Sequence, residues 1–456
     1  MRSVWFMSTV TTLVPESTDD ELSRIWREES LRYVSAINAY VARGLKDGWE
    51  KAGRQPEDTR SRLACAVIAV VRRANQKGTP KALRDFFPPA FEPLLDLIKE
   101  NGQVLPLALL LNDGRIVVRI GAPYETGRVV LIDGDRIHEQ SRDMITVGRS
   151  PNRRWFAVAR SSGVTVHDGW EGRQVGEYPW PVGREGVPSG FDVPATDGAP
   201  IITRLVPFCD GTRVLLISPN GVFVLGPDRA IRLLPSGERM REFFEWLRKE
   251  HPDDPLYFNL SMEHGDVSPD GRWIAAGDQD SLHYIYDATN LQLAGEIGNV
   301  ESYPHYAAFS SDSSLVAFNS CHFYNGATIG APIQLLPGLK TEPYSRDPRI
   351  TTLQEGARVY AAVHRKDEFI VGDAYGYLRA FDHRGGFRWQ HFIGSTIGHI
   401  DLSPDGKRLI VTSCAGFLCV IDLDTGTPDP FSIGTASHRE RRRWLFWRNE
   451  PQPLIW

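Results

Sequence analysis

The sequence is poor in cysteine and has no long hydrophobic run. Only five of its 456 residues are cysteine, and no two of them form a CxxC pair: Cys65, Cys209, Cys321, Cys414 and Cys419. This pattern is typical of reduced thiols and excludes a disulfide framework, so we expect a cytoplasmic protein. The longest apolar stretch, residues 63–71, is far shorter than the roughly 20 residues that span a bilayer. We therefore expect no membrane contact.

Lysine is also scarce. Only nine of the 52 basic residues are lysine, a bias typical of a GC-rich bacterial genome. The net charge of −5 argues against a chain that binds nucleic acid over its whole surface. Residues 1–16 have too short an apolar core for a signal peptide, and translation starts at either Met1 or Met7.

The usual sequence signatures of enzymes and metal sites are missing. There is no Gly-x-Ser-x-Gly elbow, no phosphate-binding loop, no HExxH motif and no Cys/His pair with metal-ligand spacing. The nearest approach to a histidine cluster is His251, His264 and His283, which we interpret as loop or core residues. We therefore predict no catalytic residue, no metal and no cofactor.

Residues 17–101 have the pattern of a helical domain. Apolar residues recur at three- and four-residue steps from Leu22 to Leu45, which gives the first helix one apolar face. A second helix is expected from about Asp58 to Gly78, and a shorter one over Phe91–Asn101. The apolar face is expected to pack within this domain or against the rest of the chain. Alternatively, it binds a partner.

After Gly102 the sequence changes to short β-rich runs that follow a repeat. GDVSPDGRWIAAGDQDSLHYIYD at 265–287 matches IDLSPDGKRLIVTSCAGFLCVID at 400–422. The Ser-Pro-Asp-Gly turn recurs in weaker form seven times in all. Its Asp or Asn lies at positions 113, 152, 210, 270, 312, 367 and 405, at intervals of 39, 58, 60, 42, 55 and 38. A unit near 40 residues with four strands predicts a β-propeller.

These repeats resemble the WD-repeat and related propeller families over roughly residues 103–433. The Trp-Asp ending of the third strand is absent, and Tyr286-Asp287, Phe381-Asp382 and Ile421-Asp422 stand there instead. The resemblance implies a mainly β fold, a seven-bladed propeller, with six or eight blades as alternatives. We expect this propeller to follow the helical domain and to precede an aromatic-basic tail at 434–456.

Three long insertions are expected in the connections between blades. They lie at 179–200 between units two and three, at 236–256 between three and four, and at 339–350 between five and six. The second reads as an amphipathic helix. All three are then predicted to emerge on one edge of the propeller, where loop variation is tolerated.

The leading functional prediction is a non-catalytic scaffold that binds one or more proteins, as a subunit of a larger complex. Large aromatic residues in the insertions are the predicted contact residues: Trp180, Phe191, Phe243, Trp246 and Tyr344. The alternative is that these aromatics cap the propeller core or dock the helical domain.

Two other functions stay open. An enzyme of lactonase or quinone type would place converging acidic or histidine side chains at the central channel. Nucleic-acid binding would use the tail, whose basic and aromatic residues suit phosphates and bases: Arg439, Arg441, Arg442, Arg443 and Trp444. Alternatively, the tail has a structural role: it buries its aromatic residues on the propeller, or it supplies a closing strand.

Overall fold

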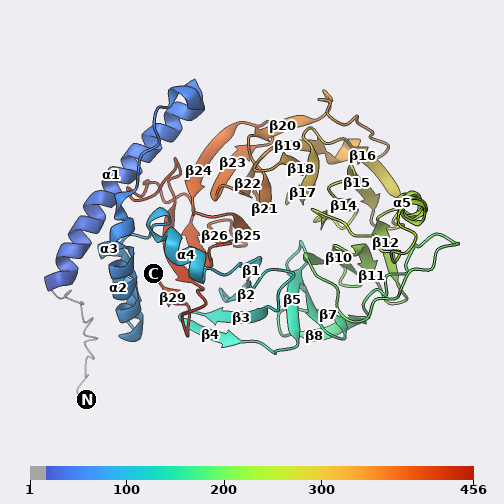
Figure 1. The fold of residues 1–456 in the computed structure, drawn as a ribbon, viewed down its shortest axis with the longest axis horizontal. Helices are drawn as coiled ribbons and strands as arrows, with labels where there is room; N and C mark the ends of the chain where they lie inside the picture. The colour runs from blue at the N-terminus through green and yellow to red at the C-terminus, as the bar shows by residue number, and fades with distance from the viewer. Residues whose placement is uncertain (1–16) are drawn as a thin grey trace, which may run out of the picture.

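The computed structural model describes residues 17–456, and seven antiparallel sheets surround one axis in it (Figure 1). The predicted segment 1–16, with the choice between Met1 and Met7, lies outside the described residues. Each sheet is one blade, and its first strand lies nearest the axis. The prediction of a mainly β, seven-bladed propeller is confirmed, and the alternatives of six or eight blades are wrong.

The first four blades each contain four strands in sequence order. Blade 1 contains β1 (Leu107–Leu110), β2 (Ile116–Ile120), β3 (Arg128–Asp133) and β4 (Arg136–Glu139). Blade 2 contains β5 (Met144–Arg149), β6 (Trp155–Arg160), β7 (Gly163–Asp168) and β8 (Arg173–Tyr178). Blade 3 contains β9 (Arg204–Pro207), β10 (Val214–Ser218), β11 (Gly221–Leu225) and β12 (Ala230–Leu234). Blade 4 contains β13 (His264–Val267), β14 (Trp273–Gly277), β15 (His283–Asp287) and β16 (Leu293–Ile297).

The last blade differs from the others by a fifth strand. Blade 5 contains β17 (Tyr303–Phe309), β18 (Leu315–His322), β19 (Asn325–Pro332) and β20 (Thr351–Glu355). Blade 6 contains β21 (Val359–Arg365), β22 (Glu368–Asp373), β23 (Tyr377–Asp382) and β24 (Phe387–Phe392). Blade 7 contains β25 (Ile397–Leu402), β26 (Arg408–Ser413), β27 (Phe417–Asp422), β28 (Arg439–Leu445) and β29 (Leu454–Ile455). Blade 7 therefore extends well beyond residue 433.

The seven predicted turns all join the first and second strands of a blade. In blade 4, Ser268 Oγ donates to Asp270 Oδ1 (2.5 Å) and accepts from Trp273 N (2.9 Å). The fourth position of this turn has a left-handed backbone, which Gly271 adopts without strain (φ 72°). Ser403 and Asp405 repeat the arrangement in blade 7. The Ser-x-Asp pair thus satisfies the backbone where each hairpin reverses.

Strand direction divides the propeller into two rims. The edge that carries these seven turns is the turn rim, which also carries the links from third to fourth strands. The opposite edge, the connection rim, carries the links between blades and the hairpins between second and third strands.

The aspartate that precedes the turn in the two best repeats joins neighbouring blades. Asp401 Oδ2 accepts from the backbone N–H of Leu110 in blade 1 (2.6 Å). Asp266 Oδ2 accepts from the backbone N–H of Phe309 in blade 5 (3.3 Å). The repeat therefore encodes both a turn within a blade and a contact to the next blade.

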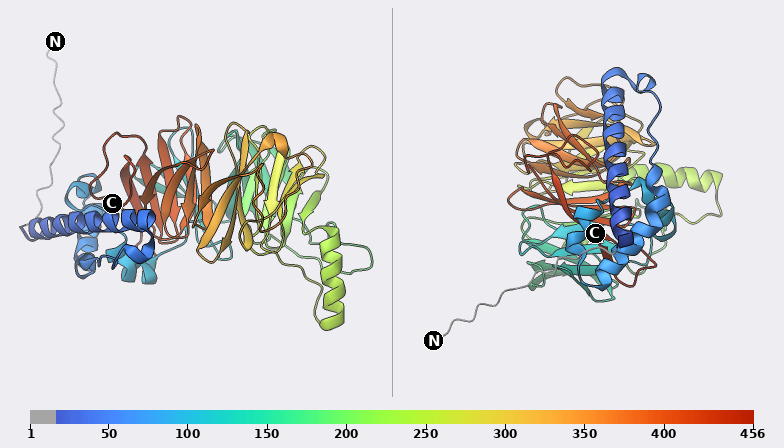
Figure 2. Two further views of the ribbon diagram at one scale, coloured as in Figure 1. Left: turned by 90° about the horizontal axis from the view of Figure 1, so that it is seen from above. Right: turned by 90° about the vertical axis from the view of Figure 1, so that its left-hand side faces the viewer.

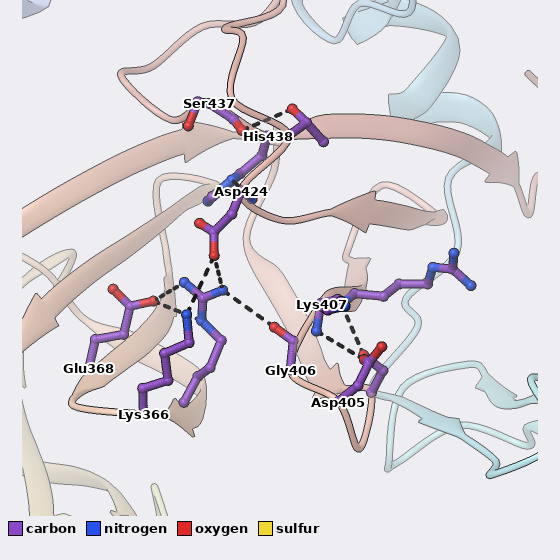
Figure 3. Close-up of polar contacts among 12 residues, drawn as sticks. Lys366, Glu368, Asp405, Gly406, Lys407, Asp424, Ser437 and His438 are labelled. Carbon is purple, nitrogen blue, oxygen red and sulfur yellow. Dashed lines mark hydrogen bonds and ion pairs between the residues drawn. The ribbon is translucent and has the colours of Figure 1, made fainter.

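A further polar contact joins blades 6 and 7 at the turn rim (Figure 3). Arg365 pairs with Glu368 (2.6 Å) in its own blade and with Asp424 (2.7 Å) in blade 7. Its Nη1 also donates to the Gly406 carbonyl (3.3 Å). His438 Nδ1 accepts from Asp424 N (3.0 Å), which holds the segment between β27 and β28.

The helical segment lies against the outer side of blades 6 and 7 (Figures 1 and 2). It contains α1 (Ser17–Asp47), α2 (Ala64–Gln76), α3 (Leu83–Phe86) and α4 (Leu95–Asn101), with short 3-10 turns η1 (Trp49–Lys51), η2 (Thr59–Leu63), η3 (Pro80–Ala82) and η4 (Glu92–Leu94). No helix within 17–456 is long and apolar enough to cross a bilayer.

Helices and propeller share one hydrophobic core. Trp26 of α1 is fully buried, and its ring lies 6.5 Å from that of Trp456. Trp456 Nε1 donates to the Phe87 carbonyl (2.6 Å). Ile37, on the predicted apolar face of the first helix, is also buried. The outer face of blades 6 and 7 is thereby covered.

The third predicted insertion is in a different place from the one expected. Residues 339–350 lie between β19 and β20, inside blade 5, and not between blades 5 and 6. From there the chain runs parallel to β16 of blade 4, with Lys340 bridged to Glu296. The prediction failed because the polar strand β20, TTLQE, has no clear alternation. The segment covers the open edge of blade 4.

Candidate functional site

The connection rim carries two of the three insertions and most of the exposed aromatic side chains on the propeller. Residues 179–200 and 236–256 link blades 2, 3 and 4 there. Because the third insertion starts at the turn rim and runs along blade 4, the prediction that all three emerge on one rim is wrong.

The insertion 236–256 forms α5 (Gly237–Glu250), which projects beyond the sheets (Figure 2). Ser236 Oγ caps it by accepting from Arg239 N (3.2 Å). Met240, Phe244 and Leu247 form its buried face. Together with Val193 from the insertion 179–200, Met240 and Phe244 form a small separate core. The two insertions are therefore one structural unit, which we call the arm.

An ion pair fixes the arm to blade 4. Arg239 Nη1 and Nη2 lie 2.6 and 3.0 Å from the two carboxylate oxygens of Asp278, which is completely buried. The Arg239 guanidinium also stacks over Phe258, 5.2 Å from the ring centroid. A bidentate pair with a buried carboxylate gives the first turn of α5 a defined direction.

The structure separates the five predicted aromatic contact residues into three groups. Trp180 is buried and its Nε1 donates to the Arg160 carbonyl (2.9 Å), so it caps the core of blades 2 and 3. Phe191 and Phe243 are partly buried and pack inside the arm. Trp246 on α5 is 49% exposed, and Tyr344 beside blade 4 is 71% exposed. Only these last two are free to contact a partner.

A second aromatic surface lies on the connection rim at blades 5 and 6. Phe323 and Tyr324 form the tip of the β18–β19 hairpin and are 74% and 59% exposed. Tyr375, from the β22–β23 hairpin, lies 5.7 Å from Tyr324 between ring centroids. His322 and Tyr303 stack beside the tip. We call these five residues the rim aromatic cluster.

The cluster is held rigidly, although its rings face solvent. Tyr375 Oη donates to Asn325 Oδ1 (3.2 Å), and Arg358 N donates to the Tyr324 carbonyl (2.9 Å). Phe323 has φ 53°, a left-handed conformation that is unusual for a bulky residue. The signal in the sequence was Phe-Tyr-Asn-Gly at 323–326, where two aromatics stand at a hairpin turn.

The central channel holds charged groups, as the enzyme alternative requires. Asp266 pairs with Arg204 (3.1 Å), and Asp401 pairs with Arg149 (2.7 Å). Burial raises the pKa of Asp266, and burial lowers the pKa of His399 to about 4. Each pair joins strands of different blades, so we assign these groups to packing of the ring. Within 17–456, no three His, Cys, Asp or Glu side chains are placed to hold a metal ion.

The three histidines noted in the sequence do not form one cluster. His264 Nε2 and His283 Nδ1 are 3.2 Å apart and both rings are buried in blade 4. His251 instead lies against Trp246 in the arm (5.4 Å between centroids).

The basic residues of the predicted tail are part of a sheet. Arg439, Arg441, Arg442, Arg443 and Trp444 all belong to β28. Arg443 is buried and pairs with Glu440 (2.8 Å), whereas Arg442 pairs with Asp135 of blade 1 (2.5 Å). Burial would raise the pKa of Glu440, but Arg443 and Arg84 lower it to about 2. Trp444 is buried between blades 7 and 1.

Comparison with known proteins gives matches among solved structures. No protein-family model and no curated protein sequence matches the chain. Among solved structures, 1383 chains match. One is a chain in the crystal structure of the mitotic checkpoint complex, which is 12% identical with a TM-score of 0.44, over 68% of this chain and 84% of that chain.

Proposed function

We propose that this protein is a non-catalytic scaffold that binds other proteins through its connection rim, as a divergent relative of the WD-repeat propellers. The Ser-Pro-Asp-Gly turns and the four-stranded blades support this relationship. The five cysteines are free, which supports a reducing compartment such as the bacterial cytoplasm.

The observation that carries the proposal is the rim aromatic cluster. A bulky residue in left-handed backbone costs of order 1 kcal/mol or more, and an exposed ring recovers little of it by burial. Phe323 combines both features at a hairpin tip. Exposed aromatic residues on a rigid frame are what protein interfaces use as central contacts.

The arm supplies a second contact surface on the same rim. Trp246 is half exposed on a helix that is fixed by Arg239 and Asp278. A partner that contacts both surfaces would span blades 4 to 6.

The test is affinity capture from the source cell with three forms of the full chain. We expect proteins captured by the wild type to be lost with the double variant Phe323→Ser/Tyr324→Ser. The control Phe387→Ser removes an exposed aromatic from the turn rim and should capture the same proteins as the wild type. Equal capture by all three forms, with equal melting temperatures, would contradict the proposal.

A further inference from the structure

The interface between blades 7 and 1 is the one place where the ring closes without a direct chain connection between the two blades. A cavity of about 1060 Å³ opens beside it and continues under the helical segment. Leu110, Ile116 and Ile132 of blade 1 and Ile410 and Val420 of blade 7 line its apolar part. This volume is enough for a ligand of nucleotide size.

Positive charge is concentrated along this cavity. Nine basic and four acidic side chains line it, an excess of five positive charges in a chain whose net charge is −5. Near the blade interface the basic residues are Lys81, Arg408, Arg439, Arg441 and Arg442.

Two carboxylates neutralise part of this group. Asp422 pairs with Arg408 (3.0 Å) and Arg441, and Asp135 pairs with Arg442 and, at 3.8 Å, with Lys81. Arg439 is exposed and has no ion pair within residues 17–456. Five cations therefore share two anions at the mouth of the cavity.

A buried donor without an acceptor faces the same place. Trp444 lines the cavity and is only 2% exposed, and its Nε1 has no hydrogen-bond partner in the described chain. Arg442 stacks over the Trp444 ring (5.1 Å). A buried N–H without a partner is costly, and an oxygen of a ligand in the cavity would satisfy it.

We propose that this cavity binds a small organic phosphate. Arg439 and the neighbouring cations of β28 hold the phosphate oxygens, since guanidinium groups match phosphate geometry. The Trp444 N–H donates to an oxygen of the same ligand, and the apolar lining accepts its uncharged part. The site is separate from the connection rim, so the proposal does not depend on the scaffold function.

The test is calorimetric titration of the full chain with pyrophosphate, with AMP and with a short single-stranded oligonucleotide. We expect AMP to bind with a dissociation constant below about 1 mM. Binding of pyrophosphate as well assigns the affinity to the phosphate group. Binding of the oligonucleotide alone, or of none of the three, would overturn the proposal.

Three variants locate the site. Arg439→Glu is expected to weaken AMP binding about tenfold, because it replaces a positively charged donor by a carboxylate that repels the negative phosphate. Trp444→Phe removes the N–H, leaves a smaller aromatic ring and is expected to weaken binding about fivefold. Arg229→Glu makes the same charge change on an exposed residue of blade 3 and should leave binding unchanged. Wild-type affinity in Arg439→Glu at an unchanged melting temperature would exclude this site.

Discussion

Asp401 in blade 7 lies 2.7 Å from the guanidinium of Arg149 in blade 2, so the pair reaches across blade 1. The same carboxylate accepts from Leu110 N in blade 1 and contacts Arg153 at 3.3 Å. One side chain therefore holds three blades together where the ring closes. Burial would raise the pKa of Asp401, but Arg149 and Arg153 hold it below its usual value.

Replacing Asp401 by Asn should strongly destabilise the propeller. Removing the charge leaves two largely buried arginines without their anion, and we expect the free energy of unfolding to fall by about 3 kcal/mol. Chemical denaturation measures this. The control Asp168→Asn breaks the ion pair with Arg154, which is more exposed than that of Asp401, and should cost much less. Equal effects of the two substitutions would contradict this role of Asp401.

The blade count could be predicted because each turn is encoded locally. Ser268 and Asp270 satisfy their own hairpin, as do Ser403 and Asp405, so a short stretch of sequence is enough to recognise them. The number of times that this stretch recurs then gives the number of blades.

Features that depend on distant residues were not predictable in this way. The strand β28, RERRRWL, resembles a solvated tail because the partners of Arg442 and Arg441, Asp135 and Asp422, lie elsewhere in the sequence. The polar strand β20 has no periodic pattern and was not recognised as a strand. The third insertion was therefore predicted between blades 5 and 6 instead of inside blade 5. Of the proposed aromatic contact residues, Trp246 was predicted because it lies in an insertion that reads as an amphipathic helix, whereas the tip of the β18–β19 hairpin reads as a continuation of a strand.

Stability should fall in mild acid because several histidines are buried in neutral form. Burial lowers the pKa of His264, His364 and His391 to about 4, from an ordinary value near 6.5. Their unfolded forms take up protons first, so stability is complete above about pH 6.5 and is lost as the pH falls toward 4.

Denaturation at several pH values between 7 and 4.5 measures this loss. Each such histidine adds up to about 1.4 kcal/mol per pH unit to the slope of the free energy of unfolding against pH. His391→Gln should reduce the slope by the contribution of one proton. A free energy of unfolding that is constant between pH 7 and 5 would contradict neutral burial of these rings.

The arm allows a partner contact to be separated from stability. Trp246→Ala removes a half-exposed ring and should reduce capture of the partner while the melting temperature changes little. Met240→Ala, on the buried face of the same helix, should lower stability by about 2 kcal/mol or more. If Trp246→Ala lowers the melting temperature as much as Met240→Ala does, the ring serves the arm's own packing.

The conformation of Phe323 leads to the sharpest prediction, in which one substitution changes stability and binding in opposite directions. Glycine accepts φ 53° without strain, so Phe323→Gly should raise the free energy of unfolding by about 1 kcal/mol. The same substitution removes a ring of the rim aromatic cluster that is 74% exposed and should abolish capture of the partner. Lys366→Gly is the control, because Lys366 has φ 55° in an exposed turn at the turn rim. It should also stabilise the chain, with capture unchanged. Loss of stability in Phe323→Gly would mean that the ring packs for the fold, and retained capture would mean that it binds nothing.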